Sequence, residues 1–216
     1  MMFKYFSAGG KLLKTYNDCY FIHFEYKNDD AQDFFSKIEQ YIRAFDVFTN
    51  QLAQPFGMGI EINLEIQRLE NGSLRLWLKD ILEKIDENTI RTYINTPKEA
   101  IIDFIIFLRK KLLKALQENK HNEILQINNE AFKNSSLANE LGYSIDEPLL
   151  LESISILTKK ALNFENPPSI YIDNENYTIE NAFDYDIKEV CEVKKQEIKG
   201  TFSIKKPDLQ GIASGS

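Results

Sequence analysis

The chain is poor in the residue types that usually mark metal sites and disulfide scaffolds. Its 216 residues include only two cysteines, Cys19 and Cys191, and only two histidines, His23 and His121. Their separation gives no zinc-site spacing, and two cysteines are too few for a secreted disulfide scaffold. We therefore interpret the cysteines as isolated core thiols, His23 as a hydrogen-bonded structural residue and His121 as a solvated residue of a polar linker.

Long apolar runs and nucleotide-binding motifs are also missing. No segment reaches the ~18 apolar residues that a membrane-spanning helix needs, and the N-terminus has no basic-then-apolar signal peptide. The sequence contains no glycine-rich phosphate loop, nucleophile elbow or dinucleotide fingerprint. The formal charge of -7 argues against a general nucleic-acid-binding protein. We expect a cytoplasmic protein without a cofactor or a metal site.

The strongest positive signal is a pair of alternating runs over residues 58–81. Apolar and polar residues alternate along both runs, which is typical of half-buried strands, and Asn71-Gly72 between them indicates a hairpin. A three-residue loop, Glu70 to Gly72, keeps the apolar residues on one face. It pairs Ile66 with Leu76 and Leu64 with Leu78.

A long amphipathic helix is predicted before this hairpin. Residues 19–26 alternate as a strand, and Asn28-Asp29-Asp30 supplies a helix start. Apolar residues then recur at three-four spacing: Ala31, Phe34, Phe35, Ile38, Tyr41, Ile42, Phe45, Phe48 and Leu52. Neither the helix nor the hairpin can bury its apolar side alone, so we expect them to form one α+β module over residues 1–82.

Residues 83–165 are predicted to be a helical region. Thr96-Pro97-Lys98-Glu99 starts a helix to about Glu118, and Asp146 starts a second that ends before Pro167-Pro168. The first helix is apolar almost all round, which is typical of a core helix or an oligomer interface. Its candidate interface residues are Ile101, Ile102, Phe104, Ile105 and Leu108. The basic cluster Arg109-Lys110-Lys111 leaves a membrane-surface role open.

Residues 166–216 are predicted to be β-rich, with strands over 169–172, 188–194 and 198–205. Asp184, Glu192 and Lys194 give this segment an alternative function as a metal-dependent nuclease. Carboxylates bind Mg²⁺, and a lysine orients the attacking water in such sites. A solvated acidic surface is the competing interpretation. The closing Gly-Ile-Ala-Ser-Gly-Ser looks like an interrupted strand, which suggests a longer natural chain.

The order of these elements resembles an uncharacterised bacterial family associated with mobile elements and phage-defence neighbourhoods. The matching pieces are residues 20–26, 34–52 and 60–81, with Gly72-Ser73 at the turn, and the tail 200–207 resembles the family's continuation into a further β-rich segment. The resemblance supplies no catalytic residues. It places the family's apolar middle region at residues 101–116, where charges interrupt this chain.

The sequence thus predicts an α+β fold with an N-terminal strand-helix-hairpin module, central helices and a C-terminal β-rich segment. It favours a non-catalytic interaction or ligand-sensing protein, self-associating or bound to a protein partner, in phage defence or a mobile element. A small ligand and a membrane surface remain open as partners. The nuclease and a membrane-acting defence effector are the alternatives.

Overall fold

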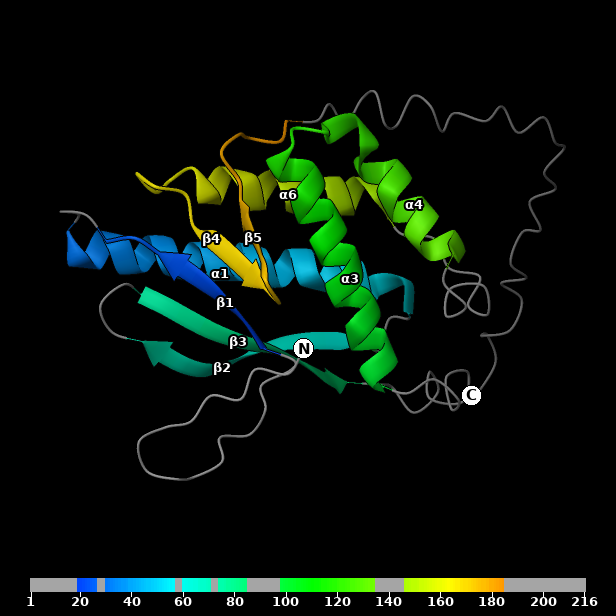
Figure 1. Cartoon of the computed structure of the whole chain (residues 1–216), viewed down its shortest axis with the longest axis horizontal. Helices are drawn as coiled ribbons and strands as arrows, with labels where there is room; N and C mark the ends of the chain where they lie inside the picture. Colours follow the sequence, from blue (N-terminus) through cyan, green and yellow to red (C-terminus); the bar gives the residue numbers. More distant parts are fainter. Residues whose placement is uncertain are drawn as a thin grey trace, which may run out of the picture. The chain divides into compact units, whose positions relative to one another are not determined.

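The computed structural model describes residues 19–26, 30–56, 60–70, 74–84, 98–134 and 146–184. They form an α+β fold in which helices pack on a five-stranded antiparallel sheet of order β2-β3-β1-β4-β5 (Figure 1). The predicted fold class is therefore confirmed. The elements are β1 Cys19–Phe24, α1 Ala31–Ala53, η1 Gln54–Phe56, β2 Glu61–Glu70, β3 Leu74–Lys84, α3 Lys98–Gln117, η2 His121–Glu123, α4 Ile124–Asn134, α6 Glu147–Ala161, β4 Ser169–Ile172 and β5 Glu175–Thr178.

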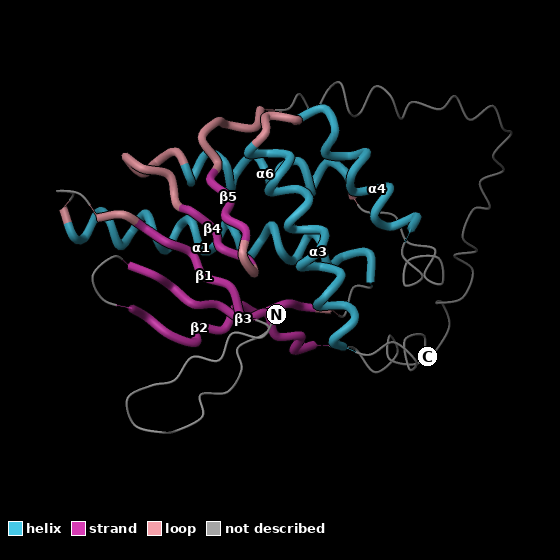
Figure 2. The backbone as a smooth tube through the Cα atoms, viewed as in Figure 1, coloured by secondary structure: helices cyan, strands magenta, loops and turns pink. Residues whose placement is uncertain are grey.

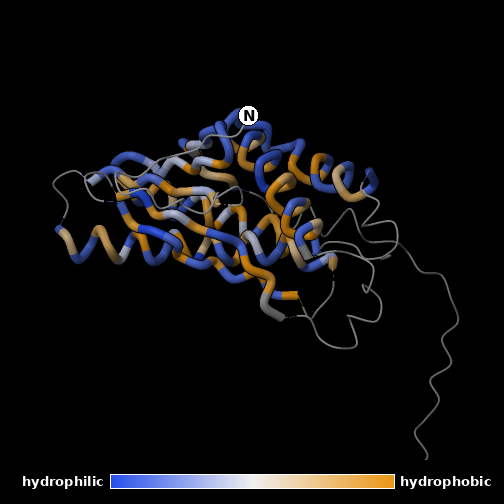
Figure 3. Tube along the Cα trace, turned by 60° about the horizontal axis from the view of Figure 1, so that its bottom comes forward, coloured by the Kyte–Doolittle hydropathy of each residue, from blue (hydrophilic) through white to orange (hydrophobic). Residues whose placement is uncertain are grey.

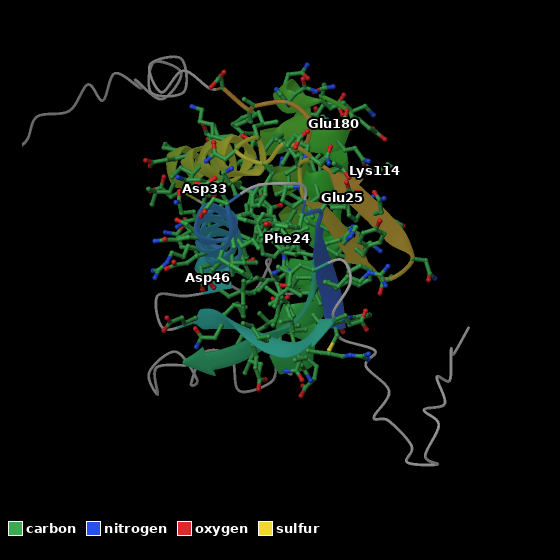
Figure 4. All side chains as sticks on the ribbon, turned by 90° about the vertical axis from the view of Figure 1, so that its left-hand side faces the viewer. Phe24, Glu25, Asp33, Asp46, Lys114 and Glu180 are labelled. Atoms are coloured by element: carbon green, nitrogen blue, oxygen red, sulfur yellow. The ribbon has the colours of Figure 1, made fainter. Side chains whose placement is uncertain are left out.

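Helix α1 lies along the sheet as its amphipathic pattern predicts. Asp30 caps it, because its carboxylate accepts hydrogen bonds from the backbone N–H groups of Gln32 and Asp33. The buried stripe of α1 meets β1 through two aromatic pairs, Phe45 with Tyr20 and Tyr41 with Phe24. Figure 4 labels Phe24, whose ring lies between the helix and the sheet.

Phe35 is an exception to the predicted apolar stripe of α1. The sequence places it on the buried side, but it is 60% exposed. It follows the buried Phe34, whose ring it contacts at 5.9 Å, and lies near the N-terminal end of the helix. Phe35 is turned about a quarter of a helical revolution away from Phe34, which places it at the edge of the buried stripe.

The β2–β3 hairpin forms, but in a different register from the predicted one. Ile66 lies opposite Leu78 and Leu64 opposite Asp80, whereas the sequence argument paired them with Leu76 and Leu78. The predicted loop assumed two regular strands. The register already differs beside the turn, where Leu69 lies opposite Leu76, and the bulge at Gln67, which has no partner residue in β3, shifts it again between Ile66 and Arg68. Residues 71–73, including the predicted turn glycine, lie outside the described residues.

The sheet joins segments that are far apart in the sequence. β1 is flanked by β3 on one side and by β4 on the other, and β5 completes the sheet (Figure 2). The predicted strand at 169–172 is confirmed as β4, while β5 and α4 were not predicted. All described residues belong to one compact unit, residues 1–185. The predicted strands at 188–194 and 198–205, and a helix start at Thr96, lie outside the described residues.

The core is filled from both the helices and the strands. Figure 3 shows hydrophobic and hydrophilic positions interspersed along the helices and strands. Helix α6 packs against α1, and Phe164 just after it contacts the rings of Phe24, Phe34 and Tyr41. Helix α3 lies on the same side of the sheet and contacts β3 and β5. These layers position the charged groups described next.

Candidate functional site

A buried ion pair lies at the centre of the core. Arg109 of α3 and Asp80 of β3 have side chains that are 0% and 1% exposed, and Arg109 Nη1 is 3.0 Å from Asp80 Oδ2. Arginine and aspartate are almost never fully buried unless they are paired. The sheet and α3 therefore meet through a charge-charge contact that is shielded from water.

Hydroxyl groups and aromatic rings complete the surroundings of this pair. The Tyr20 hydroxyl donates to Asp80 Oδ1 at 2.9 Å, and Arg109 Nη2 donates to Thr49 Oγ1 at 3.0 Å. The Arg109 guanidinium also lies 4.9 Å from the ring centre of Tyr20 and 5.0 Å from that of Phe45. Such rings attract a cation through their negative faces. The network thus connects β1, β3, α1 and α3.

The protonation states of the network follow from burial and charge. Burial by itself lowers the pKa of Arg109, but the Asp80 carboxylate and Tyr20 outweigh it, so the pKa stands above its ordinary value. Burial is the main reason that the pKa of Tyr20 is raised well above its usual range. Arg109 therefore stays charged and Tyr20 neutral. The sealed pair has no access to a substrate, so its role is structural.

Asp46 is a half-buried carboxylate of α1 that interacts electrostatically with Asp80 and Arg109 of this network. It lies on the side of α1 that faces the β2–β3 hairpin (Figure 4). Burial raises the pKa of Asp46, and the carboxylates of Glu61 and Asp80 raise it further, while Arg109 opposes them. Its Oδ1 is 3.3 Å from the Asn50 amide nitrogen. A charged Asp46 thus slightly destabilises the folded state.

Replacement of Asp46 with asparagine is expected to stabilise the protein at neutral pH. The folded state holds the Asp46 proton more tightly than the unfolded chain does, so its contribution to stability is present below the ordinary pKa of 3.8 and lost as pH rises. Asparagine stays neutral and keeps an acceptor for Asn50. Urea unfolding should therefore show a gain at pH 7 that disappears below about pH 4. A gain of equal size at both pH values would contradict this explanation.

The predicted interface residues of α3 lie mainly inside the chain. Ile101, Phe104, Ile105 and Leu108 are buried against the rest of the unit, and only Ile102 is half-buried. Their burial within a single copy removes most of the apolar surface on which an interface at this helix would depend. This arrangement corresponds to the alternative that α3 is a core helix.

The predicted basic cluster after these residues does not form a common surface. Arg109 is buried in the ion pair, while Lys110 Nζ is 2.9 Å from Asp173 and Lys111 lies over the ring of Phe107. Among the described residues, no helix is long and apolar enough to cross a membrane. A membrane-binding patch at 109–111 therefore has no support in the geometry.

The alternative nuclease residues are only partly described. The side chain of Asp184 is 78% exposed, and its carboxylate forms a surface ion pair with Lys159 Nζ at 3.1 Å. Glu192 and Lys194 lie outside the described residues. Within the described ranges, no three histidine, cysteine, aspartate or glutamate residues lie together in a group that could hold a metal ion.

The histidines and the described cysteine differ from their predicted roles. Cys19 is half-buried on the outer face of β1 and not in the core. His23 is half-buried, and its Nε2 has no hydrogen-bond partner, so the predicted hydrogen bond is not seen at that atom. His121 is half-buried in η2, with its ring 5.1 Å from that of Phe183, and is not a solvated linker residue. Cys191 lies outside the described residues.

The face of the sheet opposite the helices carries a row of aromatic rings that the sequence argument did not single out. Phe21 of β1 lies between Trp77 of β3, at 4.7 Å, and Tyr171 of β4, at 4.4 Å. Arg75 covers the Phe21 ring at 5.7 Å. Phe21 stacks on Tyr171 with 8° between the ring planes, and it is tilted by 42° against Trp77. They form a packed ridge and not the exposed stacking platform that nucleic-acid bases require.

Comparisons of the chain with protein-family models, curated proteins and solved structures gave no match. The candidate site must therefore be judged on its own geometry. The described residues define an α+β protein in which the Arg109–Asp80 ion pair is sealed in the core.

Proposed function

We propose that this protein is a non-catalytic interaction protein that self-associates and acts in bacterial phage defence or a mobile element. The proposal rests on the contrast between a charged pair that is buried and apolar side chains that are exposed. The Arg109–Asp80 pair is sealed from solvent, while Ile66 and Leu69 of the edge strand β2 are 61% and 56% exposed. Buried charge supports the fold, and exposed apolar residues favour contact with another molecule.

Self-association is tested by size-exclusion chromatography with light scattering on the full chain. We expect a mass of about twice the 25.1 kDa of one copy, falling toward one copy on dilution. A single-copy mass at every concentration would overturn self-association. Binding to a different protein partner would then remain to be sought as the basis of the interaction role.

The phage-defence setting rests on the resemblance of the sequence pattern alone. Plating phage on cells that carry the gene together with its neighbouring genes tests it. We expect fewer plaques than with a variant whose core is disrupted, Ile22→Asp, since Ile22 is 0% exposed. Equal plaque counts would contradict a defence role and leave the interaction role standing.

A further inference from the structure

The outer edge of β2 has backbone groups that point away from the sheet. The Asn50 side chain marks their direction, because its amide donates to the Ile62 carbonyl and accepts from the Ile62 N–H, both at 2.9 Å. Backbone groups of an antiparallel strand alternate in direction, so Leu64 and Ile66 point outward as well. Neither makes a backbone hydrogen bond on that side with another described residue.

The bulge changes this alternation further along the strand. Gln67 is the extra residue, so Arg68 and Glu70 point toward Trp77 and Arg75 of β3. Leu69 therefore points outward. The outward positions of β2 are thus Leu64 and Ile66 before the bulge and Leu69 after it. The odd interval between Leu64 and Leu69 distinguishes this edge from that of a regular strand.

The side chains along this edge are apolar on one face and charged on the other. Leu64 and Leu69 lie opposite Asp80 and Leu76 of β3, which are on the helix side of the sheet. Glu65 and Arg68 lie opposite Lys79 and Trp77, on the other face. Among the described strands β2 is at the edge of the sheet, and its exposed Ile66 and Leu69 give an apolar edge of the kind that templates strand addition.

We infer that the β2 edge pairs antiparallel with the β2 edge of a second copy, giving one continuous sheet across the dimer. The two-fold axis passes between Ile66 and Gln67, so that Leu64 faces Leu69 of the second copy and Glu65 faces Arg68 of the second copy. Both pairs then occur twice, as an isologous interface requires. At the Leu64–Leu69 pairs outward backbone groups meet outward groups and apolar meets apolar, at the Glu65–Arg68 pairs opposite charges meet, and at the axis Ile66 faces the bulge residue Gln67.

The bulge selects a second copy over an ordinary extended peptide. A regular strand has outward groups at even intervals, so it matches either Leu64 or Leu69 but not both. A second β2 carries the same odd interval and matches both when it runs antiparallel. Arg68 also lies 3.0 Å from Glu70 of its own strand. The several donors of its guanidinium can serve both carboxylates.

Leu69→Pro gives the first test, and the inference depends on the proposed self-association. The Leu69 N–H points outward and faces Leu64 of the second copy, so proline removes a donor from the dimer but none from the β2–β3 ladder. We expect the variant to keep its circular-dichroism spectrum and to dimerise about tenfold more weakly or worse, because both copies lose a hydrogen bond.

Charge exchange gives a second test that does not depend on a proline. Glu65→Arg alone and Arg68→Glu alone each bring like charges together twice, so each should weaken the dimer about tenfold. A mixture of the two variants restores both opposite-charge pairs and should form a heterodimer. Glu152→Arg, a charge reversal at an exposed position of α6, is the matched control and should leave the dimer unchanged.

The outcomes separate the inference from the proposed function. Loss of dimer in the single variants with recovery in the mixture supports pairing at β2. A dimer that survives Leu69→Pro and both charge reversals overturns this surface and leaves self-association intact. A wild-type chain that stays monomeric overturns both. If Leu69→Pro does not fold, the behaviour of the mixture still decides.

Discussion

Replacement of Asp80 with asparagine should destabilise this protein more than almost any other polar substitution. The asparagine oxygen can still accept the hydrogen bond that the Tyr20 hydroxyl donates. The Arg109 cation, however, stays buried and loses its counter-charge. An unpaired buried charge costs about 3–5 kcal/mol, so the midpoint of thermal unfolding should fall by about 10 °C. Differential scanning calorimetry on the wild type and the variant measures the change.

Two further variants identify the cause of that loss. The double substitution Asp80→Asn with Arg109→Met removes both charges and should recover most of the stability, because no unpaired charge remains. Glu39→Gln breaks an exposed ion pair with Arg43 and should change stability by less than about 1 kcal/mol. If Asp80→Asn costs no more than Glu39→Gln, the buried pair does not hold the sheet and α3 together.

The sequence contains a signal for this pair that periodicity alone does not reveal. Asp80 continues the alternation of Leu76 and Leu78 on β3, and Arg109 lies in the helical stripe with Ile105 and Leu112. Each is thus a charge at a core position. Nothing local links the two, since they are brought together only when α3 packs on the sheet. Long-range pairing of this kind depends on tertiary structure, which propensity does not describe.

Elements with strong periodicity were predictable, and the details of their ends and edges were not. The pattern of α1 and the alternation of β2 and β3 gave the correct element types. The bulge at Gln67 was missed because apolar alternation is as compatible with a regular strand as with an interrupted one. The exposure of Ile66 was missed because alternation shows on which face of the strand a residue lies. It does not show how far along that face the neighbouring helix extends.

Phe45→Ala should reduce the free energy of unfolding by about 3–5 kcal/mol, because a large buried ring leaves a cavity that the surroundings fill only partly. Phe45 is 0% exposed, and its ring contacts Tyr20 and Phe48 and lies 5.0 Å from the Arg109 guanidinium. Phe35→Ala is the matched control on the same helix. Phe35 is 60% exposed, so its loss should cost no more than about 1 kcal/mol. Urea unfolding of the two variants compares them directly, and similar costs would mean that α1 does not cover the sheet with the face that contains Phe45.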